Sequence, residues 1–275
     1  MPAHKDVSSQ SDDHLKNVKR WFGTHAQEWS DLYKDVRRVN DIVLINRKNI
    51  AVNCIAQRLP QGSRILDAGC GAGLVALDLA RRGYFVHGVD IAREMIELCE
   101  ENLGGQGIPP DRYSFTQADI LHSSLEAGAF DAVIALGVLQ YQVSQEPMLR
   151  TFHRLLKPGG FVIVSGPTEY QIPNFFGVPA AGGRLLRKLG LLKRPQPRGQ
   201  TRYRYGVGRY KAVLRGFDFE EVDFVGHGFA NWAVIGPLIG FRGELLLHRL
   251  FTGLSRVLPI SRWANDLVFV ARRKS

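Results

Sequence analysis

Acidic side chains and glycines follow short apolar runs in the first third of the chain, in an order that suits nucleotide binding. Asp67 comes after Ile65 and Leu66, and the glycine-rich stretch Asp67–Gly73 starts with it. Glycine lets the backbone turn sharply and approach a ligand that a Cβ atom would exclude. Asp90 ends the next apolar run, at about the 20-residue distance that places a carboxylate on a ribose. The pattern predicts a βαβ unit with a nucleotide at its carboxyl edge.

The acid at position 67 separates this turn from the dinucleotide fingerprint. In that fingerprint the glycines directly follow the strand and place a pyrophosphate on a helix N-terminus, where a carboxylate would repel it. A cationic ligand suits Asp67 better. The alternative is a Rossmann-type domain that binds another nucleotide.

The stretch Asp67–Gly73 resembles motif I of the class I S-adenosylmethionine-dependent methyltransferases. Trp21–Ala26, with Trp29 and Tyr33, is similar to the N-terminal helix that covers the cofactor in the small-molecule and lipid-quinone branch of that superfamily. The similarity keeps the family's order and spacing through four further segments, which are Val89–Ile91, Gln117–Ile120, Phe130–Leu139 and Leu155–Gly160.

The resemblance implies S-adenosyl-L-methionine as the cofactor. Methyl transfer from a sulfonium is an in-line displacement whose donor is already activated, so orientation, desolvation and proton removal remain for the protein, and no metal is expected. The implied cofactor contacts are Asp67, Gly69 and Gly71 on the methionine and ribose portion, Asp90 on the ribose hydroxyls, Ile91 on the adenine face, Asp119 and Ile120 on the adenine edge, Leu136 near the methionine end, and Arg47 on the methionine carboxylate.

Three residues are candidates for the base that takes a proton from the methyl acceptor. They are Tyr141 just after the fourth predicted strand, His25 on the covering helix and His227 at the end of a later strand. Where similar enzymes often have Leu-Glu-His, this chain has Leu139-Gln-Tyr141. No Asn/Asp-Pro-Pro-aromatic tetrad follows that strand, which disfavours methylation of an exocyclic base amine.

Alternating strands and helices predict an α/β fold, a Rossmann-like doubly wound sheet that is mostly parallel. The resemblance implies that the last two strands close this sheet as an antiparallel edge pair. With 275 residues and 45% apolar content, the chain suits one large domain. We expect an N-terminal helical cap over residues 1–60, a cofactor-binding core over 61–166 and 217–275, and a basic lid over 167–216. The predicted strands are Arg64–Asp67, Phe85–Asp90, Tyr113–Gln117, Phe130–Ala135, Phe161–Ser165, Phe217–Val225 and Asp266–Ala271.

The full chain has a net charge of +10, and the positive charge is concentrated in its second half. No acid occurs between Tyr170 and Phe217, and the lid within this stretch is rich in arginine and lysine. Such a block indicates an anionic partner, and nucleic acid would also accept it. A solvated loop whose charges only keep it soluble is the alternative.

A second feature of this half is a basic amphipathic helix over 242–258. Arg242, Arg249 and Arg256 recur on one helical face. The opposite face is predicted to be apolar, and it packs either on the domain's own core or on a membrane surface. Its residues are Leu246, Leu247, Leu250, Phe251, Leu254 and Leu258.

These observations lead to a cytoplasmic enzyme that lies peripherally on the inner face of a membrane. Three scattered cysteines fit a reducing compartment, and residues 1–13 have no apolar signal region. We expect methyl transfer to an amphipathic, anionic small molecule or lipid, with oxygen preferred as the methylated atom. An RNA methyltransferase and a non-catalytic cofactor-binding scaffold are the alternatives, and the sequence does not fix the oligomeric state.

Overall fold

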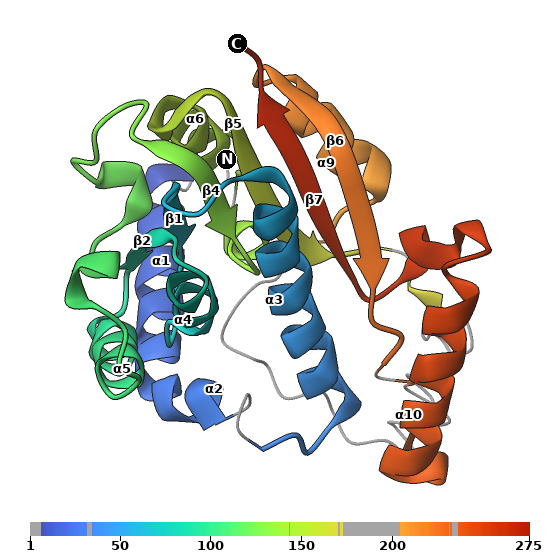
Figure 1. Ribbon diagram of the computed structural model, residues 1–275. Helices are drawn as coiled ribbons and strands as arrows, with labels where there is room; N and C mark the ends of the chain where they lie inside the picture. Colours follow the sequence, from blue (N-terminus) through green and yellow to red (C-terminus); the bar gives the residue numbers. More distant parts are fainter. Residues whose placement is uncertain are drawn as a thin grey trace, which may run out of the picture.

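A seven-stranded sheet lies at the centre of the computed structural model (Figure 1). The strand order is β3-β2-β1-β4-β5-β7-β6, and β7 runs antiparallel to both of its neighbours while the other pairs are parallel. The strands are β1 (Arg64–Ala68), β2 (Phe85–Asp90), β3 (Tyr113–Gln117), β4 (Phe130–Ala135), β5 (Leu156–Pro167), β6 (Phe219–His227) and β7 (Asp266–Arg273). The structure describes residues 7–31, 35–142, 144–169, 171–172, 204–230, 232 and 236–275.

Helices cover both faces of the sheet, because successive side chains of each strand point to opposite sides. Ile65 and Ile134 belong to the apolar cluster on one face, and their neighbours Leu66 and Val133 belong to the cluster on the other. This is the α/β architecture that the sequence predicts, with its antiparallel edge pair. The first face carries α3 (Val39–Arg58) and α4 (Leu74–Arg81), seen in front of the sheet in Figure 1, with α5 (Arg93–Gly104) beside them, and the second carries α6 (Glu146–Leu155) and α9 (Val207–Arg215).

Two N-terminal helices, α1 (Val7–Thr24) and α2 (Ala26–Asp31), pack on α5. Phe22 and Trp29 contact a buried cluster that contains Ala26, Ala92 and Met95. The helices therefore lie beside the edge of the sheet where β1 and β2 end. Short 3-10 helices complete the described chain at η1 (Pro110–Arg112), η2 (Ile120–His122), η3 (Leu139–Tyr141) and η4 (Pro259–Trp263).

Residues Lys157–Gly160 form an irregularity inside β5. Phe130 pairs with Leu156, and Ala132 then pairs with Phe161, so the four residues between them oppose one residue of β4. A Cβ atom at Gly160 would lie 2.9 Å from the carbonyl oxygen of Asp131, which makes glycine necessary at this close approach. The strand therefore starts at Leu156, before Phe161, where the sequence predicts its start.

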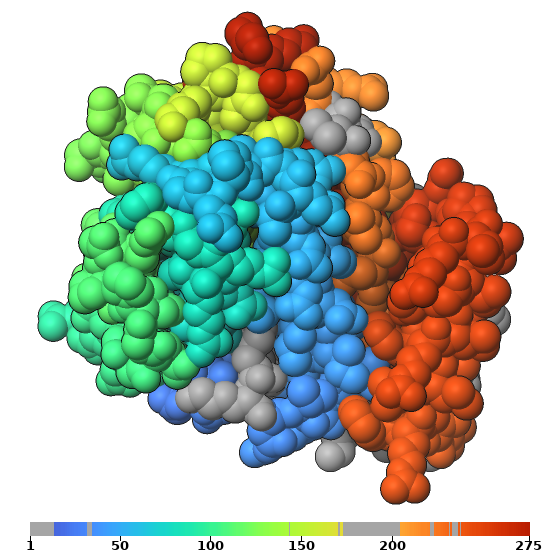
Figure 2. Space-filling view, in the orientation of Figure 1, coloured from blue at the N-terminus to red at the C-terminus, as the bar shows by residue number. Residues whose placement is uncertain are grey.

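The amphipathic helix is α10 (Gly236–Leu254), which is broken at Gly240, where φ is +62°. It stands at the edge of the molecule in Figure 1 and forms a separate lobe in Figure 2. Leu247 and Phe251 pack inward, with Phe251 5.2 Å from Trp232 between ring centroids. Leu246 and Leu250 are exposed on the outside. One part of the predicted apolar face therefore packs on the protein, and the other part faces outward.

The basic lid is only partly described. Residues 173–203, which contain most of its charge, lie outside the described residues. Within the described part, Thr168 and Tyr205 form an isolated parallel bridge, and α9 follows.

Candidate functional site

The glycine-rich turn after β1 is fixed to the end of β2. The backbone N–H groups of Gly69 and Cys70 both donate to the carbonyl oxygen of Val89, at 2.7 and 3.1 Å. Gly69 and Gly71 have φ of +75° and +52°, a region that glycine enters without steric cost. A Cβ atom at Gly71 would meet no atom within 4 Å, so the turn leaves open space above it. The local geometry is that of a backbone cradle for a ligand.

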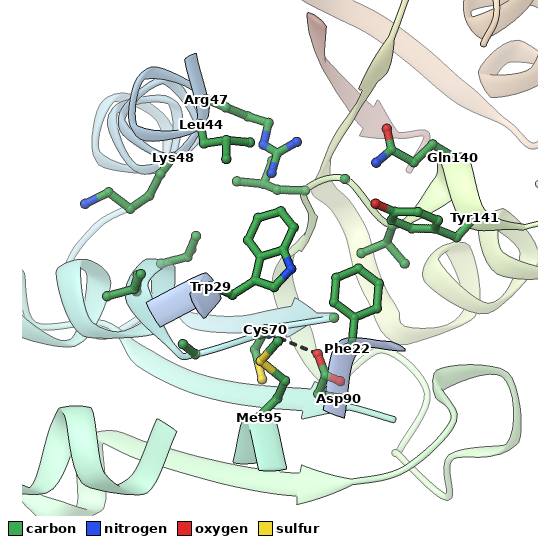
Figure 3. Close-up of a pocket in the computed structure, with 18 of the residues that line it drawn as sticks. Phe22, Trp29, Leu44, Arg47, Lys48, Cys70, Asp90, Met95, Gln140 and Tyr141 are labelled. Atoms are coloured by element: carbon green, nitrogen blue, oxygen red, sulfur yellow. Dashed lines mark hydrogen bonds between the residues drawn. The ribbon is translucent and has the colours of Figure 1, made fainter. Parts of the chain in front are cut away.

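Asp90 closes this cradle from β2. Its carboxylate accepts from the N–H of Gly71 at 3.0 Å, the dashed line in Figure 3, and from that of Ala92 at 2.9 Å. Burial raises the pKa of Asp90, and the backbone donors counteract part of that effect. Each carboxylate oxygen has two lone pairs, so both retain capacity for ligand hydroxyl groups.

Asp67 lies deeper, at the end of β1, and only 2% of it is exposed. Its Oδ2 atom has no hydrogen-bond partner among the described residues. Burial, followed by the charge of Asp90, raises the pKa of Asp67 to about 7. A buried carboxylate without a partner is costly, and a cationic ligand would offset that cost.

The remaining predicted cofactor residues lie around the same cavity, whose volume is about 1100 Å³. Asp119 uses Oδ1 to accept from the N–H of Leu121 at 3.0 Å and so starts η2. The structure brings together all nine residues that the resemblance assigns to the cofactor, which are Arg47, Asp67, Gly69, Gly71, Asp90, Ile91, Asp119, Ile120 and Leu136.

Aromatic side chains cross the middle of the cavity (Figure 3). Trp29 from α2 and Phe22 from α1 reach in from one side, and Tyr141 from η3 meets the edge of Phe22 at a centroid distance of 5.3 Å. The carbonyl oxygen of Tyr141 also lies 2.7 Å from Nε2 of His14, which ties α1 to η3. The N-terminal helices thus form part of the cavity wall.

Arg47 extends from α3 into the cavity, and its neighbour Lys48, also on the cavity wall, pairs with Asp78 of α4 (Figure 3). The guanidinium lies 3.3 Å from Oδ2 of Asp266, and both side chains are nearly buried. A Cβ atom at Gly137 would lie 2.8 Å from Nη1 of Arg47, so the loop after β4 and the arginine are closely packed. The predicted contact of Arg47 with a methionine carboxylate stays a prediction.

The two candidate histidines are not among the residues that line this cavity. The ring of His25 stacks on Trp21 at 4.5 Å, and its Nδ1 lies 2.8 Å from the Trp21 carbonyl oxygen. His227 is buried behind the wall, with Nε2 3.7 Å from Oδ2 of Asp266. Burial lowers the pKa of His227 to about 4. Of the three candidate bases, the structure brings only Tyr141 to the cavity surface.

Sequence reasoning missed the polar residues at the far end of the cavity. These residues come just before or just after strands. The strand ends concerned meet at the same edge of the sheet, because an antiparallel strand starts where its parallel neighbours end. Within the described ranges, no group of three or more His, Cys, Asp or Glu side chains is arranged to hold a metal ion. The missed residues are Gln140, Gln171, Arg204, Asn265 and Asp266.

Comparison with known proteins agrees with this geometry. Residues 66–164 match a family model described as a methyltransferase domain. A ubiquinone biosynthesis O-methyltransferase of Xanthomonas axonopodis pv. citri (strain 306) is 29% identical over 186 residues, 66% of this chain and 74% of that protein. One from Escherichia coli O8 (strain IAI1) is 30% identical over 170 residues, 60% of this chain and 66% of that protein, just under two thirds of its length.

The chain is a class I S-adenosylmethionine-dependent methyltransferase. S-adenosylmethionine is the methyl donor of this enzyme class, and the chain resembles the small-molecule and quinone branch. Solved structures share the fold of this methyltransferase. They include the magnesium protoporphyrin IX methyltransferase of Synechocystis PCC 6803, with a TM-score of 0.65 and 16% identity over 94% of this chain and all of that one. The 1,6-didemethyltoxoflavin-N1-methyltransferase of Burkholderia thailandensis has a TM-score of 0.59 and 16% identity over 100% of this chain and 94% of that one.

Proposed function

We propose that this methyltransferase methylates a hydroxyl group of an amphipathic small molecule or lipid. The cavity carries the proposal, because it has two chemically different ends. One end has the glycine turn with Asp67 and Asp90, and the other has Gln140, Gln171 and Asp266. Aromatic rings lie between these ends, a lining that suits a ring-bearing acceptor beside the cofactor. The names of the ubiquinone biosynthesis relatives favour oxygen as the methylated atom.

The residues at the first end fit S-adenosylmethionine. The open space above Gly71 leaves room for the ligand, and the unpartnered Oδ2 atom of Asp67 suits its positively charged methionine portion. In this proposal Asp90 binds the ribose hydroxyls, and Arg47 contributes at the methionine end. When bound, the cofactor supplies an activated methyl group. Adenine lies among Ile91, Asp119 and Ile120, and Leu136 borders the methionine end.

Aromatic side chains exclude water from the space between the two ligands. Trp29 and Phe22 come from the segment that we propose as a cap over residues 1–60, with residues 61–166 and 217–275 as the core and 167–216 as a lid. Tyr141 has its ring on the cavity and is the sequence-derived candidate for contacting the acceptor. Holding the acceptor in line with the methyl group provides the main rate advantage, since the donor needs no further activation.

The outward side of α10 and η4 suits an anionic lipid surface, which we propose as the place where the enzyme meets an amphipathic acceptor. Leu238 and Leu246 of α10 are 82 and 68% exposed, where a water-facing helix would have polar residues, and Val257 in the turn between α10 and η4 is 79% exposed. Arginines 242, 249, 256 and 262 are exposed on the same segment. Its acid Glu244 turns inward to accept from the N–H of Trp232 at 3.1 Å. Among the described residues, no helix is both long and apolar enough to cross a bilayer.

This combination favours a membrane over RNA. Exposed leucines interleaved with arginines match an interfacial helix, whereas single-stranded RNA is bound by stacking on exposed aromatic rings. Trp263 is partly exposed at the same surface, as aromatic residues at a lipid interface are.

The test is a methyl-transfer assay with labelled S-adenosylmethionine and three acceptors. A catechol that carries an isoprenoid chain should be methylated on oxygen, a catechol without the chain more slowly, and bulk tRNA not at all. The product is identified by mass spectrometry, and binding of the cofactor is measured in parallel by calorimetry. Labelled tRNA would contradict the acceptor class, and tight cofactor binding without turnover on any acceptor would favour the scaffold.

A further inference from the structure

The cavity is large enough for two ligands, since small-molecule sites are typically about 300–1000 Å³ and this one is about 1100 Å³. S-adenosylmethionine at the end formed by β1 and β2 leaves the opposite end, at β5 and β7, for the acceptor. Asp266 lies there as the first residue of β7. It pairs with Pro167 at the end of β5 and with His227 at the end of β6.

Two side chains from other elements and one backbone N–H group surround the Asp266 carboxylate. Arg47 of α3 has Nη1 3.3 Å from Oδ2, and His227 of β6 has Nε2 3.7 Å from the same atom. The N–H of Leu267 donates to Oδ1 at 3.1 Å. These contacts leave lone pairs on both carboxylate oxygens, while the side chain lines the cavity.

The histidine beside this carboxylate is neutral at physiological pH. The pKa of His227 is lowered to about 4, chiefly by burial. The charges of Arg47 and His248 also lower it, and the charge of Asp266 counteracts part of the effect. Arg47 approaches from α3, His248 lies on α10, and Tyr210 of α9 is the further titratable group whose pKa Asp266 raises. Since His227 is uncharged, the ion pair consists of the Asp266 anion and the Arg47 cation. A carboxylate that is nearly removed from water is a strong hydrogen-bond acceptor.

We propose that Asp266 is a catalytic residue that binds the acceptor hydroxyl group and takes its proton during methyl transfer. Arg47 is a positioning residue that holds the carboxylate toward the cavity, and the uncharged ring of His227 packs beside it. The O–H bond of the acceptor breaks as its proton passes to Asp266, and an oxygen lone pair forms the new C–O bond. The sulfur–methyl bond breaks with its electron pair on sulfur, and the proton leaves from Asp266 to water after turnover. This inference rests on the proposed O-methylation.

Tyr141 is the alternative proton acceptor at this cavity, and chemistry distinguishes the two. A tyrosine hydroxyl must first lose its own proton before it can accept one, whereas an ionised carboxylate accepts directly. The structure also gives the carboxylate a guanidinium partner that fixes its direction, through a contact between α3 and β7.

The experiment uses the full chain and the isoprenoid catechol. Asp266→Asn keeps the shape and removes the charge, and we expect it to lower kcat about 100-fold or more, the usual size of a general-base contribution. The dissociation constant of S-adenosylmethionine should stay within about threefold. The kcat of the variant should rise with pH as the acceptor ionises by itself, whereas the wild-type kcat should be level over the same range. Glu100→Gln, on the exposed side of α5, is the control for loss of one negative charge.

Two further variants keep the result decisive even where Asp266→Asn folds poorly. Asp266→Glu retains the charge and moves the carboxylate, so we expect a lower kcat with the level pH profile preserved. His227→Asn changes the packing beside the carboxylate without removing it, so it should lower kcat by a smaller factor and also retain the level profile. Wild-type kcat in Asp266→Glu, or an Asp266→Asn enzyme with more than a third of wild-type kcat and the wild-type pH profile, would overturn the role of Asp266. A wild-type enzyme that binds the cofactor but methylates no hydroxyl acceptor would instead overturn the proposed function.

Discussion

Asp67 shows how one buried carboxylate can make cofactor binding depend on pH. Its pKa of about 7 in the ligand-free protein arises from burial and from the charge of Asp90. A cationic ligand binds the ionised form, so affinity should increase as pH rises through 7.

We expect S-adenosylmethionine to bind up to about tenfold more tightly at pH 8 than at pH 6, because the ionised fraction of Asp67 rises from about a tenth to about nine tenths. Calorimetry at both pH values tests this. S-adenosylhomocysteine is the matched ligand, since it lacks the sulfonium charge, and its affinity should change less. An Asp67→Asn variant with the same pH dependence as the wild type would show that another group is responsible.

Asp90 should affect both ligands alike, since they share the ribose. Asp90→Ala removes charge-assisted hydrogen bonds and should weaken the binding of each of the two ligands by about 1.5–3 kcal/mol. Asp90→Asn preserves more of the turn, because an amide oxygen can still accept from the N–H of Gly71. Asp111→Ala, a substitution in η1, is the control. Unchanged affinity of Asp90→Ala in calorimetry would refute the ribose contact.

The sequence predicted the residues at the end of the cavity with Asp67 and Asp90, but not those at the end with Asp266. Asp67 and Asp90 each end an apolar parallel strand, a pattern visible in one chain segment. Asp266 precedes its strand, and only the antiparallel pairing of β7 with β5 brings it to the same edge. His25 was misplaced because a helix with many aromatic residues does not reveal which ring faces the cavity.

At the scale of elements, the strands were predicted to within a few residues where apolar runs end at glycine or an acid. The start of β5 was missed because Lys157–Gly160 reads as a turn, although it is a bulge within the strand. The sequence could not show which side of α10 packs on the protein, because Leu246 and Leu247 are the same residue type, although the first is exposed and the second packs inward. Phe229 and Trp232, which cover Leu247 and Phe251, come from a preceding segment without regular periodicity.

The outward side of α10 gives a prediction about lipid binding. The double substitution Leu246→Glu and Leu250→Glu should reduce co-sedimentation with vesicles of mixed neutral and anionic lipid about tenfold or more, since each buried leucine contributes roughly 1.5–3 kcal/mol. The melting temperature should change little, because both side chains face outward.

Phe85→Glu, on β2 at the other side of the sheet in Figure 1, is the matched control, because Phe85 is also an exposed large apolar residue. Phe251 is unsuitable for this test, since its substitution would disturb the packing against Trp232. Wild-type protein that stays in the supernatant at low salt, or a double variant that sediments like the wild type, would refute the lipid contact.

For the whole molecule, two buried groups should make the free energy of unfolding depend on pH in opposite directions. His227 has a folded pKa of about 4, below its unfolded value of about 6.5, so its contribution is lost as pH falls across that window. Asp67 has a folded pKa of about 7, above its unfolded value of about 3.9, so stability falls as pH rises across that window.

Single substitutions should separate these opposing effects. With Asp67→Asn, the free energy of unfolding should rise by about 3 kcal/mol more than in the wild type between pH 4 and 6.5. With His227→Asn, it should rise less than in the wild type, or fall. Urea unfolding at several pH values measures both slopes. Two variants whose slopes match that of the wild type would mean that neither group changes its proton affinity on folding.

The position of β7 in the sheet also has a consequence for synthesis on the ribosome. β7 lies between β5 and β6, although both of these strands are made before it. Until residues 266–273 leave the exit tunnel, β5 has an open edge and β6 has no partner, and such edges are places where nascent chains associate wrongly. Because β7 emerges after β5 and β6, it joins these two strands and delivers Asp266 to the cavity in the same step.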